Sequence, residues 1–342
     1  MTNITYTMRK YLIVISLLLI PLLNFSQQSN SDSLSSGQPH FKVFWNYNYD
    51  FTEGATRISA FELSRVYLGY KYSFNDNICA KITYDIGENE AGSSHTAFLK
   101  IAQLDWELDP NVKLSLGMIR GKQFDDQEKI WGYRYLYKTL QDEYKFGSSA
   151  DLGINVELKI SNKLVTNLFI VNGEGYKDIQ SEDGNQRFGA NLIYKPNGKI
   201  ISKFYYDTHA ILNSKSINNL GIFIGFNSAK FRFGAEYNKM QNAESYKLAA
   251  ENHNLEGISL YGSYAINDKL ELFIRYDKLS SNNTDDNIIN WNYENDGSLN
   301  MIGIQYSSVK GVKFSLNSRN FNFNDNNISD STLIYFNAEF KL

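Results

Sequence analysis

The sequence predicts an all-β fold, a 16-stranded antiparallel transmembrane β-barrel with a short helix in its long third extracellular loop. Three observations support this prediction. Apolar and polar residues alternate with a period of two over most of residues 40–342. Tight turns alternate with long polar loops along the same stretch. Aromatic residues make up 15% of the chain, and tyrosine and phenylalanine are enriched in strands.

The beginning of the chain is predicted to be an export signal. Arg9 and Lys10 precede the short apolar run Tyr11–Leu23, and the small residue Ser26 follows it. This order is typical of a secretory signal peptide, here residues 1–26, and either Met1 or Met8 fits as its start. The polar, serine-rich stretch 27–39 is then a flexible lead-in, and residues 40–342 form the barrel.

The first predicted strand illustrates the alternation. One parity holds apolar side chains and the other is mostly polar. The apolar set is Phe41, Val43, Trp45, Tyr47, Tyr49 and Phe51, and the polar set is Lys42, Asn46, Asn48 and Asp50. The last strand repeats the pattern, with Ile334, Phe336, Ala338, Phe340 and Leu342 on its apolar face.

The connections between strands give the strand count. Seven of them are tight: Asn75–Asn77, Asp109–Asn111, Ser161–Asn162, Pro196–Gly198, Asn227–Ala229, Asn267–Asp268 and Ser308–Gly311. Eight are long: residues 52–60, 87–96, 122–146, 172–186, 209–216, 240–254, 279–297 and 321–331. Fifteen connections give sixteen strands. Short turns at one rim and long loops at the other are typical of outer-membrane barrels.

The alternative is a soluble all-β protein such as a sandwich or a propeller, whose apolar parity would face a core. Tyrosines near strand ends would then bury many hydroxyl groups. A sandwich also gives no reason for long and short loops to alternate. A closed barrel, in contrast, leaves no unpaired strand edge in lipid, so it can span a membrane despite a mean hydropathy of −0.40.

Composition excludes several other classes. A net charge of −3 gives no support to nucleic-acid binding. The single cysteine, Cys79, excludes a disulfide scaffold and a thiolate-bound metal cluster. No glycine-rich phosphate loop or metal-ligand cluster stands out, so the sequence predicts no cofactor and no metal.

Residues 65–180 resemble the phosphate-selective porin O/P family. The resemblance rests on the segments Arg65–Lys71, Leu104–Glu107, Leu114–Gly117, Trp131–Arg134, Lys145–Gly153 and Val171–Tyr176. It implies a homotrimeric porin in the outer membrane of a Gram-negative bacterium, surrounded by outer-membrane lipids, with a constriction loop folded into the barrel. Some members of that family prefer phosphate or other anions.

The polar parity predicts which residues line the pore. The basic residues expected along an anion track are Arg65, Lys71, Lys81, Lys113, Arg187, Lys203, Arg232, Arg275 and Arg319. Guanidinium groups suit phosphate and carboxylate, and a ring of like charge selects ions by sign. The alternative is that these residues form ion pairs across the lumen and stiffen the wall.

The longest loop, residues 122–146, is expected to constrict the pore. In its second half Tyr133, Leu136, Tyr137, Leu140 and Tyr144 follow the spacing of one helix face. Arg134, Lys138 and Lys145 form an adjacent basic stripe. We expect a short helix whose tyrosine face packs on the wall and whose basic stripe faces the aperture. In the alternative arrangement the helix lies over the outer mouth.

The predicted function is therefore passive diffusion of small hydrophilic solutes, with a modest preference for anions. One alternative is a plugged barrel that binds or adheres through its long loops. Another is a barrel lipase, for which only the neighbours Ser93, Ser94 and His95 offer a serine and a histidine. No G-x-S-x-G motif surrounds them, so an enzyme is not predicted.

Overall fold

The computed structural model describes residues 36–342 except 53, 57, 88–94 and 285–289. The predicted signal peptide, together with Ser93 and Ser94, lies outside the described residues. Within them there are sixteen strands and two helices, whose bounds are β1 (Ser36–Asp50), β2 (Ser59–Ser73), β3 (Ile78–Gly87), β4 (Thr96–Asp109), β5 (Val112–Arg120), α2 (Asp125–Trp131), α3 (Leu140–Glu143), β6 (Ala150–Ser161), β7 (Leu164–Val171), β8 (Arg187–Tyr194), β9 (Ile200–His209), β10 (Ile217–Asn227), β11 (Phe231–Ser245), β12 (Leu248–Ala265), β13 (Leu270–Ser281), β14 (Gly297–Val309), β15 (Val312–Phe323) and β16 (Ser331–Lys341).

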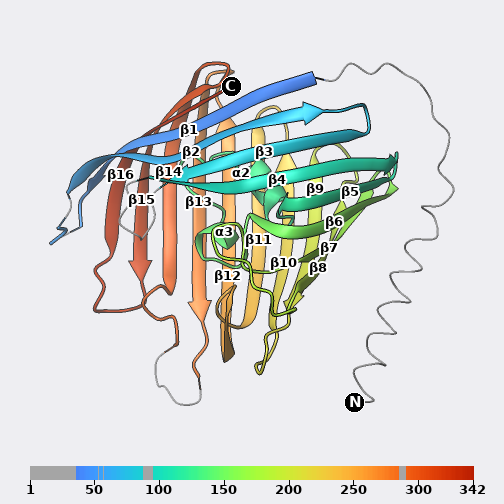
Figure 1. Ribbon diagram of the computed structural model, residues 1–342. Coiled ribbons are helices and arrows are strands. Elements are labelled where there is room, and N and C mark those ends of the chain that lie inside the picture. Colours follow the sequence, from blue (N-terminus) through green and yellow to red (C-terminus); the bar gives the residue numbers. More distant parts are fainter. Residues whose placement is uncertain (1–35, 53, 57, 88–94, 285–289) are drawn as a thin grey trace. The chain divides into compact units, whose positions relative to one another are not determined.

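The strands form one closed barrel (Figure 1). Each strand pairs antiparallel with its neighbours in sequence, and β1 closes the ring by pairing with β16 from Lys42↔Lys341 to Asp50↔Leu333. Closure gives every strand a hydrogen-bonded neighbour on each side over most of its length, so the barrel has no free edge strand. The predicted sixteen-stranded antiparallel barrel is confirmed.

The connections follow the predicted alternation, with one difference at β11 and β12. These strands continue through residues 240–254, expected to be a long loop, and only Tyr246 and Lys247 separate them. The extension contains two register shifts, and Asn242 and Asn252 have φ values of +59° and +62°. Asparagine tolerates this conformation, and bulges accommodate the extra residues, so polar loop-like sequence still forms a ladder.

The first strand begins at Ser36, four positions before the expected start of the barrel. Residues 36–41 pair with β2 only, because the pairing with β16 starts at Lys42. Pro39 lies in this overhang. Because one side of the strand has no neighbour there, the missing N–H of proline leaves no hydrogen-bond acceptor without a partner.

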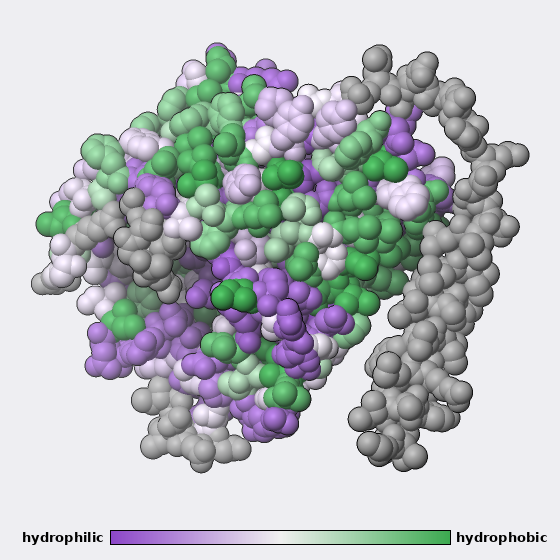
Figure 2. Space-filling view, in the orientation of Figure 1, coloured by the Kyte–Doolittle hydropathy of each residue, from purple (hydrophilic) through white to green (hydrophobic). Residues whose placement is uncertain are grey.

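The two faces of the barrel differ in chemistry. Large apolar side chains such as Phe204, Ile222, Ile274 and Ile302 are about half exposed on the outer face. Broad apolar areas cover the strands in Figure 2. The inner face instead buries polar groups, which are discussed below. Within the described residues, no helix is long and apolar enough to cross a bilayer.

Candidate functional site in the barrel interior

The connection between β5 and β6, residues 121–149, folds into the barrel and contacts the inward face of the strands that follow it (Figure 1). The Lys203 ammonium on β9 lies 3.0 Å from Asp125 and 3.2 Å from Asp126. The Tyr261 hydroxyl on β12 donates to the carbonyl of Gln127 at 3.2 Å. We call this segment the inner loop. Its inward fold agrees with the expected constriction loop.

Helix α2 forms in the first half of the inner loop, where the sequence places acids at its start and a glycine at its end. Asp125 and Asp126 lie in the first turn, and Lys129 in the last, which complements the helix dipole. Gly132 then adopts a left-handed φ of 71°, and its N–H closes the last turn on Glu128. The left-handed φ favours glycine, and a Cβ here would also displace the Arg232 guanidinium, which lies 1.8 Å from its position.

This position of the longer helix corrects the expectation that the second half of the loop is helical. The second half holds only the single turn α3, and Tyr133–Tyr137 form a tight turn closed by bonds from Leu136 and Tyr137 to the Tyr133 carbonyl. The predicted buried face is confirmed in part: Tyr133, Leu136 and Leu140 are buried, whereas Tyr137 and Tyr144 are half-buried.

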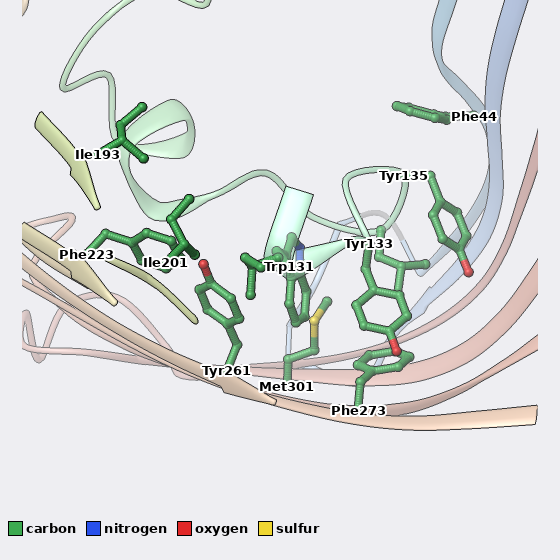
Figure 3. Close-up of a cluster of buried hydrophobic side chains, with 12 residues drawn as sticks. Phe44, Trp131, Tyr133, Tyr135, Ile193, Ile201, Phe223, Tyr261, Phe273 and Met301 are labelled. Atoms are coloured by element: carbon green, nitrogen blue, oxygen red, sulfur yellow. The ribbon is translucent and has the colours of Figure 1, made fainter. Parts of the chain in front are cut away.

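Edge-to-face and tilted aromatic contacts hold the inner loop against the wall (Figure 3). The Trp131 ring lies 5.4 Å from that of Tyr261 and 6.0 Å from that of Phe273, between ring centroids. The Tyr133 ring is 4.4 Å from Phe273. Such contacts exclude water and add about 0.5–1.5 kcal/mol per pair beyond area burial. The sequence signal for this docking surface is a set of apolar residues on the otherwise polar parity: Phe223, Tyr261, Phe273 and Met301.

Two of the predicted anion-track arginines hold the inner loop by its backbone. Arg275 donates to the carbonyl of Lys138 at 2.6 Å and pairs with Asp277 at 2.6 Å. Arg319 donates to the carbonyl of Leu136 at 2.9 Å, and its guanidinium lies 3.5 Å from the centroid of the Tyr335 ring. Both arginines are buried.

Three further track residues are also engaged with protein groups. Arg187 is buried and lies 3.8 Å from Asp207, while it donates to the carbonyl of Tyr246 at 2.5 Å. Arg232 pairs with Glu271 at 2.8 Å. Lys203, with 1% of its side chain exposed, is bound by the acids of α2 as described above. The structure therefore places these residues in ion pairs and loop anchors, the alternative that the sequence had left open.

A second loop, residues 172–186, also reaches inward. Tyr176 donates its hydroxyl to Asp85 on β3 at 2.5 Å. Asp85 is fully buried and also pairs with Arg65 at 3.0 Å and with Lys100 at 3.5 Å. Sequence parity places Asp85 among the inward-facing acids, but it did not single out Lys100 or Tyr176. The only sequence signal for this cluster was an acidic residue and two basic residues at inward-facing positions of three adjacent strands.

The predicted basic stripe of the inner loop is matched by acids of the same loop. Arg134 lies 3.0 Å from Asp142, and Lys138 lies 3.3 Å from Glu143, whereas Lys145 is exposed. Burial opposes ionisation of Asp142, but Arg134, followed by Lys138, outweighs it and holds the pKa of this carboxyl below its ordinary value. The stripe therefore adds little net positive charge to the aperture.

Lys71 and Lys81 are placed differently from the other track residues. They lie directly opposite each other on β2 and β3, near the rim of tight turns. Neither forms an ion pair within the described residues. With His40 they line a cavity of about 490 Å³. Lys113, farther round the barrel, lies 3.4 Å from Asp105.

The inner loop thus packs unevenly on the interior wall. Most of its buried contacts are with the inward faces of β9–β15, but Tyr135 also packs on Phe44 of β1 with 6.3 Å between ring centroids. On β5, charged side chains keep contact with solvent, with 34% of Lys113 and 47% of Arg120 exposed. A hydrated passage lined by charges is what this arrangement can provide.

Comparison with known proteins gives the same architecture. The chain matches no protein-family model and no curated protein sequence. Solved structures, however, match it along nearly its whole length. The outer membrane channel DcaP of Acinetobacter baumannii superposes with a TM-score of 0.66 at 13% identity, covering 92% of this chain and 99% of that one. This is the fold of the porins.

Two other porin structures agree. OmpF of Salmonella typhi, in complex with daunomycin, has a TM-score of 0.64 at 11% identity and covers 90% of this chain and 97% of its own. An anion-selective porin from Comamonas acidovorans has a TM-score of 0.62 at 12% identity and covers 90% and 100%. Identities this low establish the porin fold alone. They do not extend to membership of the phosphate-selective porin O/P family.

Proposed function

We propose that the chain is an outer-membrane porin that lets small hydrophilic solutes diffuse passively across the outer membrane of a Gram-negative bacterium. The observation that supports this most directly is the uneven docking of the inner loop. The loop packs mostly on β9–β15, and charged side chains of β5 keep contact with solvent. A polar lumen inside an apolar outer face is the arrangement that a water-filled membrane channel requires.

A modest preference for anions, including phosphate, is the finer part of the proposal. It rests on Lys71 and Lys81 rather than on the arginines. Like charges directly opposite each other in a sheet are destabilising, so the pair costs folding energy that a passing anion would offset. Membership of the phosphate-selective porin O/P family and assembly as a homotrimer belong to the same proposal.

The test is single-channel recording in a planar bilayer under a potassium chloride gradient. We expect the reversal potential of the parent chain to indicate a preference for anions. In the double variant Lys71→Glu, Lys81→Glu, the reversal potential should shift toward a preference for cations. Lys269→Glu, in the tight turn between β12 and β13, is the matched control at the same rim. Its reversal potential should equal that of the parent chain.

The possible outcomes test passive diffusion and anion preference separately. Open channels without sign preference, or a double variant that behaves like the control, would overturn the anion preference and leave a general porin. Folded protein that gives no conductance would overturn passive diffusion. The plugged barrel that binds through its long loops would then be the better description, since Tyr176 and the inner loop already narrow the interior.

A further inference from the structure

A second cleft lies on the side of the long loops, apart from the lysine pair. Three segments meet around it: the end of the inner loop at Tyr144 and Lys145, the end of β11 at Glu244, and the loop before β14 at Trp291 and Asn295. Its volume is about 230 Å³. This is smaller than the roughly 300–1,000 Å³ of drug-sized sites, so it suits a ligand of about one ring.

The floor and one wall of the cleft are apolar and fixed in place. Leu255 and Leu279 line the floor and are buried. Trp291 stacks on His253 with 4.8 Å between ring centroids, and its indole N–H donates to the carbonyl of Asn254 at 2.9 Å. Because the ring is held on one side and its donor is used, the part that faces the cleft offers an apolar surface.

The rim of the cleft carries polar groups that have no strong partner. Lys145 and Glu244 are exposed, and neither forms an ion pair or hydrogen bond within the described part of the chain. Lys145 occupies a left-handed position, φ 55°, just after α3, where glycine is usual. Asn295 adds an amide whose nitrogen already donates to Asn292 at 2.9 Å, so its oxygen remains to accept.

We propose that this cleft binds one ring of a neutral sugar. An aromatic surface takes the C–H face of a sugar ring, and carboxylate, ammonium and amide groups bond its hydroxyls. The positive charge of Lys145 and the negative charge of Glu244 balance, and Glu143, the other charged residue of the lining, is paired with Lys138 at 3.3 Å. The rim therefore favours no net charge on the ligand. The proposal stands whether or not the barrel conducts, because the cleft lies between loops and not in the passage.

The test uses the full chain folded in detergent micelles, with tryptophan fluorescence as the readout. Glucose, galactose and N-acetylglucosamine are titrated separately, and glycine and glutamate serve as amino-acid probes. We expect a saturable fluorescence change with at least one sugar and none with either amino acid. Trp291→Phe should abolish the change, and isothermal calorimetry should still detect weaker binding.

Two variants distinguish the loss of a binding group in the cleft from a general folding defect. Trp291→Ala should weaken binding by about tenfold, as expected for an aromatic anchor. Glu244→Gln, an exposed and fold-neutral change, should weaken it by about fivefold because one charged hydrogen bond is lost. Trp106→Phe, on the outer face of β4, is the matched control and should bind like the parent.

The outcomes are decisive in both directions. Sugar binding that falls with Trp291→Ala and Glu244→Gln but not with Trp106→Phe supports the site. No saturable sugar binding by the folded parent chain overturns it. Binding of an amino acid in preference to the sugars, or equal affinity in all variants, also overturns it.

Discussion

At the scale of single residues, buried guanidinium groups act here as backbone clamps. Arg275 and Arg319 reach from β13 and β15 to carbonyls of an irregular turn that has no ladder of its own. A charged donor satisfies such a carbonyl better than a neutral one, and hydrogen bonds to charged groups contribute about 1.5–3 kcal/mol each. The inner loop is therefore held where its own backbone could not hold it.

Removal of one clamp should loosen the loop without unfolding the barrel. Arg319→Gln loses the bond to the Leu136 carbonyl, and we expect larger or noisier single-channel conductance and a stability loss of about 1.5–3 kcal/mol. Arg187→Gln is the control, because Arg187 bonds the Tyr246 carbonyl outside the inner loop. Conductance of Arg319→Gln that matches both the parent and the control would contradict the clamp.

Sequence parity places these arginines correctly on the inward face, but it does not reveal their partners. The partners of Arg275 and Arg319 are backbone carbonyls of a loop, which have no sequence signature. Only Asp277, two residues from Arg275, could be found by inspection, because i and i+2 share a strand face. Lys71 and Lys81 could be predicted to be adjacent once the tight turn at Asn75–Asn77 was recognised.

At the scale of elements, the ionised acids of the inner loop fasten it to the wall. Burial opposes ionisation of Asp125, but Lys203 and then Lys129 outweigh it, so the pKa of this carboxyl is lowered. The pKa of the Asp142 carboxyl is also lowered, by Arg134 of the same loop. A lowered pKa in the folded state means that the acid stabilises the docked loop above the unfolded pKa of about 3.9. That contribution is lost as the pH falls through the folded pKa.

Conductance should therefore be independent of these carboxyls from pH 7 down to about pH 4.5, and the loop should loosen only below about pH 4. Asp125→Asn removes the bond to Lys203 and should show the loosened behaviour already at pH 7. Asp109→Asn, at the end of β4 and outside the inner loop, is the matched control. A transition of the parent channel near pH 6 would contradict this assignment.

The position of the helix shows what element prediction lacked. Tyrosine spacing in the second half of the loop reflects contact with the wall, which an irregular turn can make as well as a helix. The decisive local signals were the acids Asp125 and Asp126 and the left-handed Gly132, which define a short helix between them. The extension of β11 and β12 through 240–254 was hidden because Asn242 and Asn252 suggest a loop although they also fit bulges.

At the scale of the whole molecule, strand parity and the rhythm of turns determine the barrel. The outward residues of neighbouring strands meet in register, as Ile222 does with Phe204 and Tyr237, and form a continuous apolar surface. The fold of the interior depends on long-range side-chain contacts that no local pattern encodes, since Trp131 and Phe273 are far apart in sequence. This is why the shell is predictable and the aperture is not.

If this outer surface lies in lipid, the cost of a charge on it must depend on depth. Ile222 lies at the middle of β10 and Phe231 at the tight-turn end of β11, and both side chains are about half exposed. Ile222→Arg should cost about 2–4 kcal/mol and Phe231→Arg about 0–1 kcal/mol, because desolvation of the guanidinium grows toward the bilayer centre. Urea titrations of folding into phosphatidylcholine vesicles measure both values. Equal costs would mean that the apolar surface does not span a bilayer, since water on the outer face would solvate both arginines alike.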